Sequence, residues 1–218
     1  MFKNILCFVL FCLLFISAAI AQPFANEIAA FKKQYSISFP AKNAILFVGS
    51  SSFTMWKNVH DDFPDHTIIN RGFGGSSLPD VIRYADEIIF PYLPRQIVIY
   101  CGENDIGISD TVTSEIVRDR FGTLFEMIRN KMTEVPVVFI SIKPSVARWQ
   151  LKDRMVKANA LIREYLNKQK QTNFVNVWNA MLGEDGKPLP DIFIKDNLHM
   201  NAKGYAIWQK IIEPYLAK

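Results

Sequence analysis

The chain has 218 residues, of which 50% are hydrophobic and 21% are charged. This composition excludes a disordered chain, a collagen and a coiled coil, and the length suits one domain better than two. The chain contains 25 Lys and Arg residues and 21 Asp and Glu residues, which gives a formal net charge of +4. Because the surplus is small and no basic run forms a stripe, we expect no nucleic-acid partner.

The first 21 residues have the pattern of a signal peptide. A short, positively charged start (1–4) precedes a nearly continuous apolar run (5–20), and Ala19-Ile20-Ala21 offers the small side chains that signal peptidase requires. An uncleaved membrane anchor is the alternative, but the run is short for a span of ~20 residues. We therefore expect residues 1–21 to be removed, residues 22–218 to form one domain, and the mature protein to be periplasmic or extracellular without a stable membrane anchor.

Cysteine and asparagine usage agree with this expectation. Cys7 and Cys12 lie in the predicted signal peptide, so Cys101 alone remains and no intramolecular disulfide can form. Cys101 follows an apolar run, which favours buried packing over a reactive thiol. No Asn begins an Asn-x-Ser/Thr sequon, which favours a bacterial exported protein over a glycosylated eukaryotic one.

Short apolar runs alternate with longer amphipathic segments along the mature chain. In chain order, the pattern predicts a helix at 26–34, strands at 44–48 and 67–70, a helix at 78–90, a strand at 96–101, a helix at 117–128, a strand at 135–142, a helix at 151–166, a strand at 174–178 and a helix at 202–216. Several strands are apolar on both faces, as buried parallel strands are. The order predicts a single three-layer α/β/α domain with a parallel five-stranded sheet and a site at the carboxyl ends of the strands.

Polar segments follow the predicted strands at the places where this rule puts a site. They are Gly-Ser-Ser-Ser at 49–52, Arg-Gly-Phe-Gly-Gly at 71–75, Gly-Glu-Asn-Asp at 102–105 and, before the last helix, Asp-Asn-Leu-His at 196–199. Each segment alone is explained by a turn or a helix cap. Their combination at successive strand ends is what points to chemistry.

These residue types are those that acyl transfer requires. A serine nucleophile needs a base within hydrogen-bond reach, and the base needs a partner that orients it. His199 lies three residues after Asp196, so one tight turn can bring the carboxylate to its imidazole, whereas His60 and His66 lie in a polar stretch expected to be a surface loop. The residues alone do not distinguish Ser50, Ser51 and Ser52 as the nucleophile.

The four segments together resemble the SGNH (GDSL-type) hydrolase superfamily, a flavodoxin-like α/β fold of esterases, lipases, thioesterases and carbohydrate deacetylases. Its four motifs occur here in order between Gly49 and His199. By position, the resemblance implies Ser51 as nucleophile, His199 as base, Asp196 as orienting acid, and an oxyanion hole of Ser51, Gly75 and Asn104. The segment 70–75 is especially similar to the platelet-activating-factor acetylhydrolase-like branch. One position departs from the family pattern, since Ser50 stands where the family has Asp.

The resemblance implies an exported serine esterase that cleaves short-chain esters, above all acetyl esters, on small molecules or carbohydrates. A lysophospholipase or thioesterase of the same superfamily is an alternative substrate class. A non-catalytic carbohydrate-binding protein on the same scaffold is a further alternative, against which the intact Ser51, Asp196 and His199 set argues. A flavin or nucleotide binder would need more glycine after the first strand.

Several further residues leave two interpretations open. Phe53, Trp56 and Phe73 fit either a substrate pocket or the core. Arg71, Lys143 and Arg148 could face the cleft and favour an anionic substrate, but solvated or ion-paired side chains explain them more simply. No cofactor is expected. No metal site is expected either, because the three histidines are not clustered and no paired cysteines remain.

Overall fold

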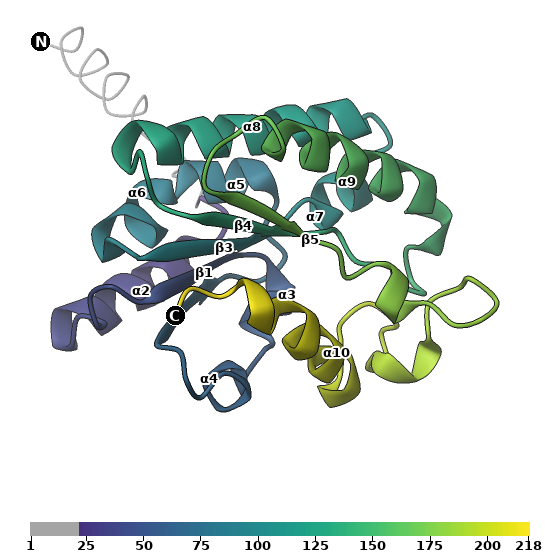
Figure 1. Ribbon diagram of the computed structural model, residues 1–218, viewed down its shortest axis with the longest axis horizontal. Coiled ribbons are helices and arrows are strands. Elements are labelled where there is room, and N and C mark those ends of the chain that lie inside the picture. Colours follow the sequence, from purple (N-terminus) through teal and green to yellow (C-terminus); the bar gives the residue numbers. More distant parts are fainter. Residues whose placement is uncertain (1–21) are drawn as a thin grey trace, which may run out of the picture.

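A computed structural model describes residues 22–218, so the predicted signal peptide, with Cys7 and Cys12, lies outside the described residues. One five-stranded sheet lies between two layers of helices (Figure 1). Its strands are β1 (Ile45–Gly49), β2 (Ile68–Gly72), β3 (Gln96–Tyr100), β4 (Val137–Ile140) and β5 (Thr172–Val175). They are ordered β2-β1-β3-β4-β5 and every neighbouring pair is parallel. The predicted fold class is therefore confirmed.

The central strands are apolar on both faces because each face is covered. In β1, Leu46 and Val48 belong to one core and Ile45 and Phe47 to the other, and all four are completely buried. This alternation is the two-residue period of a strand with a hydrophobic layer on each side. Cys101 is also buried, as expected.

Two sets of helices provide these layers (Figure 1). One core is covered by α2 (Ala25–Ile37), α5 (Leu78–Arg83), α6 (Ala85–Ile88), α7 (Glu103–Ile108), α8 (Ser114–Lys131) and α9 (Lys152–Leu166). The other is covered by α3 (Ser51–Thr54), α4 (Val59–Asp62) and α10 (Ala202–Ile212). Short 3₁₀ turns complete the chain at η1 (Phe90–Tyr92), η2 (Trp149–Leu151), η3 (Asn179–Met181), η4 (Pro190–Ile192) and η5 (Glu213–Tyr215). No helix within residues 22–218 has both the length and the apolar character needed to cross a bilayer.

Three predicted elements differ most from the structure. The helix predicted at 202–216 ends at Ile212, and the 3₁₀ turn η5, which contains Pro214, follows it. The segment 78–90 is not one helix, because Tyr84 leaves helical geometry and packs its buried ring edge-on against Phe73. The last strand ends at Val175 and does not reach residue 178. There Asn176 Oδ1 accepts a hydrogen bond from the Trp178 backbone at 3.0 Å, and this side-chain turn replaces the strand ladder.

Candidate active site

Ser51 lies directly beyond the carboxyl end of β1, at the first position of α3. The strand ends at Gly49, whose φ is +143°, and a Cβ atom at this position would lie 1.9 Å from the Tyr100 carbonyl oxygen, so only glycine fits there. The next residue is anchored to the same carbonyl, since Ser50 N donates to Tyr100 O at 3.0 Å. This tight turn leaves Ser51 partly exposed, whereas Ser50 and Ser52 are buried.

His199 is oriented by Asp196 within a single turn. Asp196 Oδ2 accepts from the His199 ring at Nδ1, 2.6 Å away, and Asp196 Oδ1 accepts from the backbone N–H groups of Leu198 and His199, both at 2.9 Å. Partial burial opposes ionisation of Asp196, but these hydrogen bonds outweigh it and lower the pKa of Asp196 to about 2. The carboxylate is therefore a permanent acceptor at ordinary pH.

Ser51 and His199 meet although 148 residues separate them. The distance from His199 Nε2 to Ser51 Oγ is 2.9 Å. Because an ionised Asp196 can only accept, Nδ1 carries the proton and Nε2 keeps a lone pair directed at the hydroxyl. The arrangement can take a proton from Ser51 and hold it on an imidazole that a carboxylate stabilises.

Gly75 lies in the loop after β2 and Asn104 in the first turn of α7, and Ser76 joins the two. Asn104 Nδ2 donates to the Ser76 carbonyl at 3.0 Å, which orients the amide and leaves its second N–H free of that bond. Ser76 Oγ donates to the Gly49 carbonyl at 3.1 Å, so the same residue ties this loop to the end of β1. Gly75 is exposed with φ +69°, a left-handed conformation that suits glycine.

Unpaired backbone donors are available beside the serine. Within residues 22–218, the N–H groups of Ser51 and Gly75 form no hydrogen bond. Free N–H groups and an oriented side-chain amide are the donors that stabilise a developing oxyanion.

Comparisons with known proteins show the family and the fold of the chain. The sequence profile of the GDSL-like Lipase/Acylhydrolase family matches residues 47–207, which include all four polar segments. The chain belongs to this family. It is thus a hydrolase of the acylhydrolase class. No curated protein sequence matches the chain significantly.

Solved structures share the acylhydrolase fold at low sequence identity. A candidate platelet activating factor from Streptococcus pneumonia superposes with a TM-score of 0.77 at 21% identity, covering 88% of this chain and 92% of that one. A GDSL-like lipase from Bacteroides thetaiotaomicron gives 0.69 at 22% identity, covering 86% and 97%. Axe2, an acetyl-xylooligosaccharide esterase from Geobacillus Stearmophilus, gives 0.64 at 12% identity, covering 82% and 96%.

A buried ion pair of the acylhydrolase lies behind the site, and its acidic partner, Glu103, was not among the residues singled out from the sequence. Lys143 is fully buried, and its Nζ lies 3.1 Å from Glu103 Oε2 and donates to the Leu198 carbonyl at 2.7 Å. Tyr100 OH also donates to Glu103, at 2.7 Å. Burial raises the pKa of Glu103, but the charges of Lys143 and Arg148 reverse this and lower it overall. Lys143 thus connects the segment after β4 both to α7, through Glu103, and to the turn that carries His199, through Leu198.

A signal for this pair was present in the sequence. Glu103 and Lys143 each closely follow an apolar strand, a place where a charge needs a partner. Lys143 and Arg148 are indeed ion-paired, through Glu103, and Arg148 Nη1 also donates to Asn104 Oδ1 at 3.0 Å.

The burial of four side chains decides between the interpretations that the sequence left open for them. Phe53, Trp56 and Phe73 are core residues, exposed by at most 2%. Arg71 does not face the cleft and is neither solvated nor paired with an acid. It is buried, bonded to the Tyr35 and Tyr92 hydroxyls and the Asn70 carbonyl, and covered by aromatic rings.

The other two histidines lie apart from the serine. His60 is an exposed residue of α4. The surface-loop expectation holds in part for each: His60 is at the surface but helical, and His66 lies in the connection before β2 but its side chain is 7% exposed and bonded to Glu213 and to the Ala217 carbonyl. Within residues 22–218, no three His, Cys, Asp or Glu side chains are grouped as metal ligands would be.

Proposed function

We propose that this acylhydrolase is a serine esterase that removes short acyl groups, above all acetyl groups, from carbohydrates through a Ser51 acyl-enzyme. The observation that carries the proposal is the alignment of Ser51, His199 and Asp196, with hydrogen-bond distances of 2.9 Å and 2.6 Å. The carbohydrate part draws support from neighbours that share the fold, which include an acetyl esterase and a carbohydrate esterase of family 3.

In the proposed reaction, Ser51 Oγ attacks the ester carbonyl while its proton passes to His199 Nε2. The negative charge that develops on the carbonyl oxygen is held by the N–H groups of Ser51 and Gly75 and by the Asn104 amide. His199 then protonates the leaving alcohol, and the acyl-enzyme forms. A water molecule, deprotonated by His199, attacks the acyl-enzyme and releases the acid and free Ser51.

The experiment compares hydrolysis of 4-nitrophenyl acetate, butyrate and octanoate, followed by an acetylated oligosaccharide, in wild type and in Ser51→Ala. We expect the variant to lose about 10⁴–10⁶-fold in kcat. Ser50→Ala is the matched control, because the neighbouring Ser50 side chain makes no cap hydrogen bond to α3, whereas Ser51 Oγ is the hydroxyl bonded to His199. Ser50→Ala should stay within a few-fold of wild type. Full activity in Ser51→Ala would overturn the proposed nucleophile.

The chain-length series separates the substrate classes. A preference for acetate over octanoate supports a short-acyl esterase, and the reverse favours a lipase or lysophospholipase. We also propose that the protein is exported, on the strength of the signal-peptide pattern at residues 1–21. Amino-terminal sequencing of the protein from a fractionated bacterial host tests this, and a mature chain that begins at Met1 would contradict it.

A further inference from the structure

The side-chain amide of Asn104 is held at both of its ends. Its Nδ2 donates to the Ser76 carbonyl at 3.0 Å, and its Oδ1 accepts from Arg148 Nη1 at 3.0 Å. The oxygen and nitrogen of an amide have nearly the same shape, so the surrounding hydrogen bonds decide which way round the group sits. If the amide turned over, its N–H groups would face the guanidinium donor and its oxygen would face the Ser76 carbonyl. Arg148 and Ser76 therefore select the orientation that leaves the second Nδ2–H for an oxyanion.

The guanidinium of Arg148 is suited to this task. A hydrogen bond from a charged donor is stronger than one from a neutral donor, and hydrogen bonds in a chain polarise one another. Donation to Oδ1 of Asn104 therefore fixes the amide and also makes its free N–H a better donor. Glu103 Oε1 lies 3.7 Å from the same Nη1, and this carboxylate also pairs with Lys143, so it anchors the guanidinium without drawing it away from Asn104.

The position of the Arg148 side chain is set by its close packing on α7. A Cβ atom at Gly107 would lie 2.9 Å from Arg148 Cζ and 3.0 Å from its Nε, so the guanidinium occupies the space that any other residue at 107 would fill. Gly107 follows Asn104 by three residues on the same helix, so the two share one helix face. Glycine is a poor helix former, and its presence within α7 is explained by this approach of Arg148.

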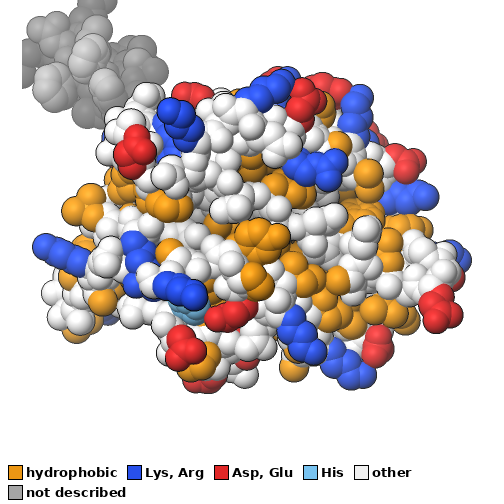
Figure 2. Space-filling model, in the orientation of Figure 1, with side chains coloured by type: hydrophobic (Ala, Val, Ile, Leu, Met, Phe, Trp, Pro, Cys, Tyr) orange, Lys and Arg blue, Asp and Glu red, His pale blue; other side chains and the backbone are white. Residues whose placement is uncertain are grey.

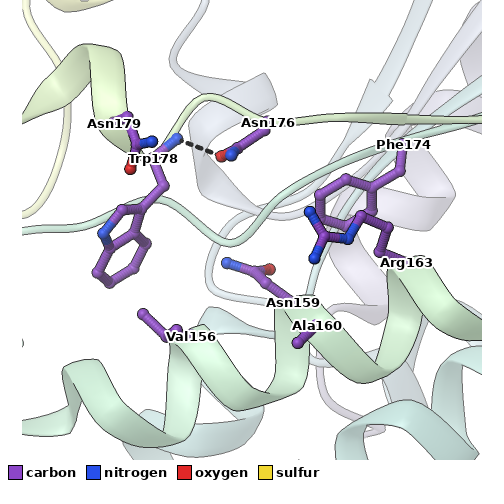
Figure 3. A pocket seen from close by; sticks show the side chains of 8 residues that line it. All are labelled: Val156, Asn159, Ala160, Arg163, Phe174, Asn176, Trp178 and Asn179. Carbon is purple, nitrogen blue, oxygen red and sulfur yellow. Dashed lines mark hydrogen bonds between the residues drawn. The ribbon is translucent and has the colours of Figure 1, made fainter.

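The backbone that carries Arg148 is anchored on both sides. Before it, Asn159 binds the N–H and the carbonyl of Ile142, at 2.8 Å and 2.9 Å. After it, Trp149 stacks on Trp178 with 6.1 Å between ring centroids. Figure 3 shows the two anchoring side chains, Asn159 on α9 and Trp178 after β5. The guanidinium is therefore presented from a fixed segment and not from a free loop.

The same segment also contacts the turn that carries the base. Ala147 N donates to the Asn197 carbonyl at 3.0 Å, between Asp196 and His199 in the chain. The segment thus meets the acid–base turn through its backbone and Asn104 through the Arg148 side chain.

We propose that Arg148 is a positioning residue of the oxyanion hole, which fixes the Asn104 amide so that its free N–H faces the ester carbonyl oxygen as negative charge develops. The inference rests on the proposed esterase function, but the contact between Arg148 and Asn104 is measurable without a substrate. Because the oxyanion exists only in the transition state, loss of Arg148 should lower kcat and leave KM nearly unchanged. A residue that bound an anionic group of the substrate would instead change KM.

The test replaces Arg148 with Met, which keeps the apolar stem and removes the guanidinium. We expect kcat for 4-nitrophenyl acetate to fall about 10- to 100-fold, with KM within a few-fold of wild type. In the Asn104→Ala background, Arg148→Met should cause little further loss, because Arg148 acts through that side chain. Arg154→Met is the matched control and should behave as wild type. Its side chain is 27% exposed, against 20% for Arg148, and it pairs with Asp110 and not with Asn104.

A second variant, Gly107→Ala, tests the same contact with Arg148 in place and carries the test if Arg148→Met does not fold. Alanine favours a helix, so we expect circular dichroism and Tm to show an intact fold. The new methyl pushes the guanidinium off the helix face that it shares with Asn104. We expect kcat to fall several-fold in Gly107→Ala, and no further loss when Gly107→Ala is added to Asn104→Ala.

Side-chain amide signals in two-dimensional ¹H–¹⁵N NMR spectra report the contact without substrate. The Asn104 pair, identified by its absence from Asn104→Ala, should move in Arg148→Met and stay in place in Arg154→Met. An unchanged kcat in folded Arg148→Met, a full loss that persists in the Asn104→Ala background, or a rise in KM alone would overturn the proposal. Asn104 signals that depend on Arg148 in a protein without Ser51-dependent hydrolysis would instead overturn the esterase and leave the positioning contact standing.

Discussion

Replacing Lys143 with Met tests how strongly the buried ion pair stabilises the fold. Met has a similar shape and fits a buried apolar site, so the change removes mainly the ammonium group. It leaves the Glu103 carboxylate, which is 5% exposed, without its 3.1 Å partner. It also removes the donor that reaches the Leu198 carbonyl at 2.7 Å.

The expected loss follows from these contacts. Removing one partner of a buried ion pair costs about 3–5 kcal/mol, and an unsatisfied carbonyl adds about 1 kcal/mol. The Tyr100 hydroxyl at 2.7 Å and Arg148 at 3.7 Å still face Glu103 and offset part of this. We therefore expect Lys143→Met to lower the free energy of unfolding by about 4 kcal/mol, and Tm by about 8–16 °C for a chain of this size.

Urea-induced unfolding monitored by circular dichroism measures this loss, and a double-mutant cycle isolates its cause. In Lys143→Met/Glu103→Gln the buried negative charge is gone as well. The double variant should then be less destabilised than the sum of the two single variants by at least about 2 kcal/mol. A loss below about 1 kcal/mol in Lys143→Met, or additive single effects, would refute the reasoning.

Three further outcomes follow from the site geometry. Asn104→Ala should lower kcat for 4-nitrophenyl acetate about 10²–10³-fold with little change in KM, because one oxyanion donor is lost; an unchanged kcat would remove Asn104 from the oxyanion hole. Gly49→Ala should abolish soluble expression, because φ is +143° and the new methyl would lie 1.9 Å from the Tyr100 carbonyl; a folded variant seen by circular dichroism would contradict this. Since hydrogen bonds hold the pKa of Asp196 at about 2, below its ordinary 3.8, the folded protein keeps this charge until pH falls through about 2, and the stability that the charge provides is full above about pH 4 and lost between there and pH 2. The kcat/KM–pH profile should therefore show no protonation of Asp196 above about pH 3, and a two-proton acid limb there would contradict the assignment.

The sequence predicted the sheet and the edge at which the polar segments meet. Apolar runs bounded by glycine and polar residues locate the strands, and parallel strands place their carboxyl ends together. The close pairing of Asp196 and His199 was also expected, because three residues is the span of one turn. Local spacing and topology are sufficient for these conclusions.

What the sequence could not predict depends on contacts between distant segments. Whether Ser50, Ser51 or Ser52 faces His199 is decided by the direction of the backbone after Gly49, and that direction depends on the close approach of Tyr100. The burial of Arg71 requires the rings of α2 and η1 to meet over β2. Neither contact leaves a periodic pattern in the chain.

The surface also shows why charge alone is a poor guide to this protein's partners. Basic and acidic side chains are interspersed on the face shown in Figure 2, with apolar side chains between them, and no patch of one sign dominates this face. Several charged side chains pair locally, as Lys203 does with Asp191 and Lys168 with Glu164.

Ser50 stands where the family has an aspartate, and the contacts of this turn explain why no acid is needed here. The turn before Ser51 is held by backbone contacts: Ser50 N bonds the Tyr100 carbonyl at 3.0 Å, and the Gly49 carbonyl accepts from Ser76 Oγ and from Phe73 N. The Ser50 side chain is buried and makes no cap hydrogen bond to α3. A carboxylate there would need donors to offset its desolvation, whereas a serine hydroxyl loses far less on burial. The turn therefore keeps its shape through glycine and β3, and the geometry of Ser51 does not depend on an acid at position 50.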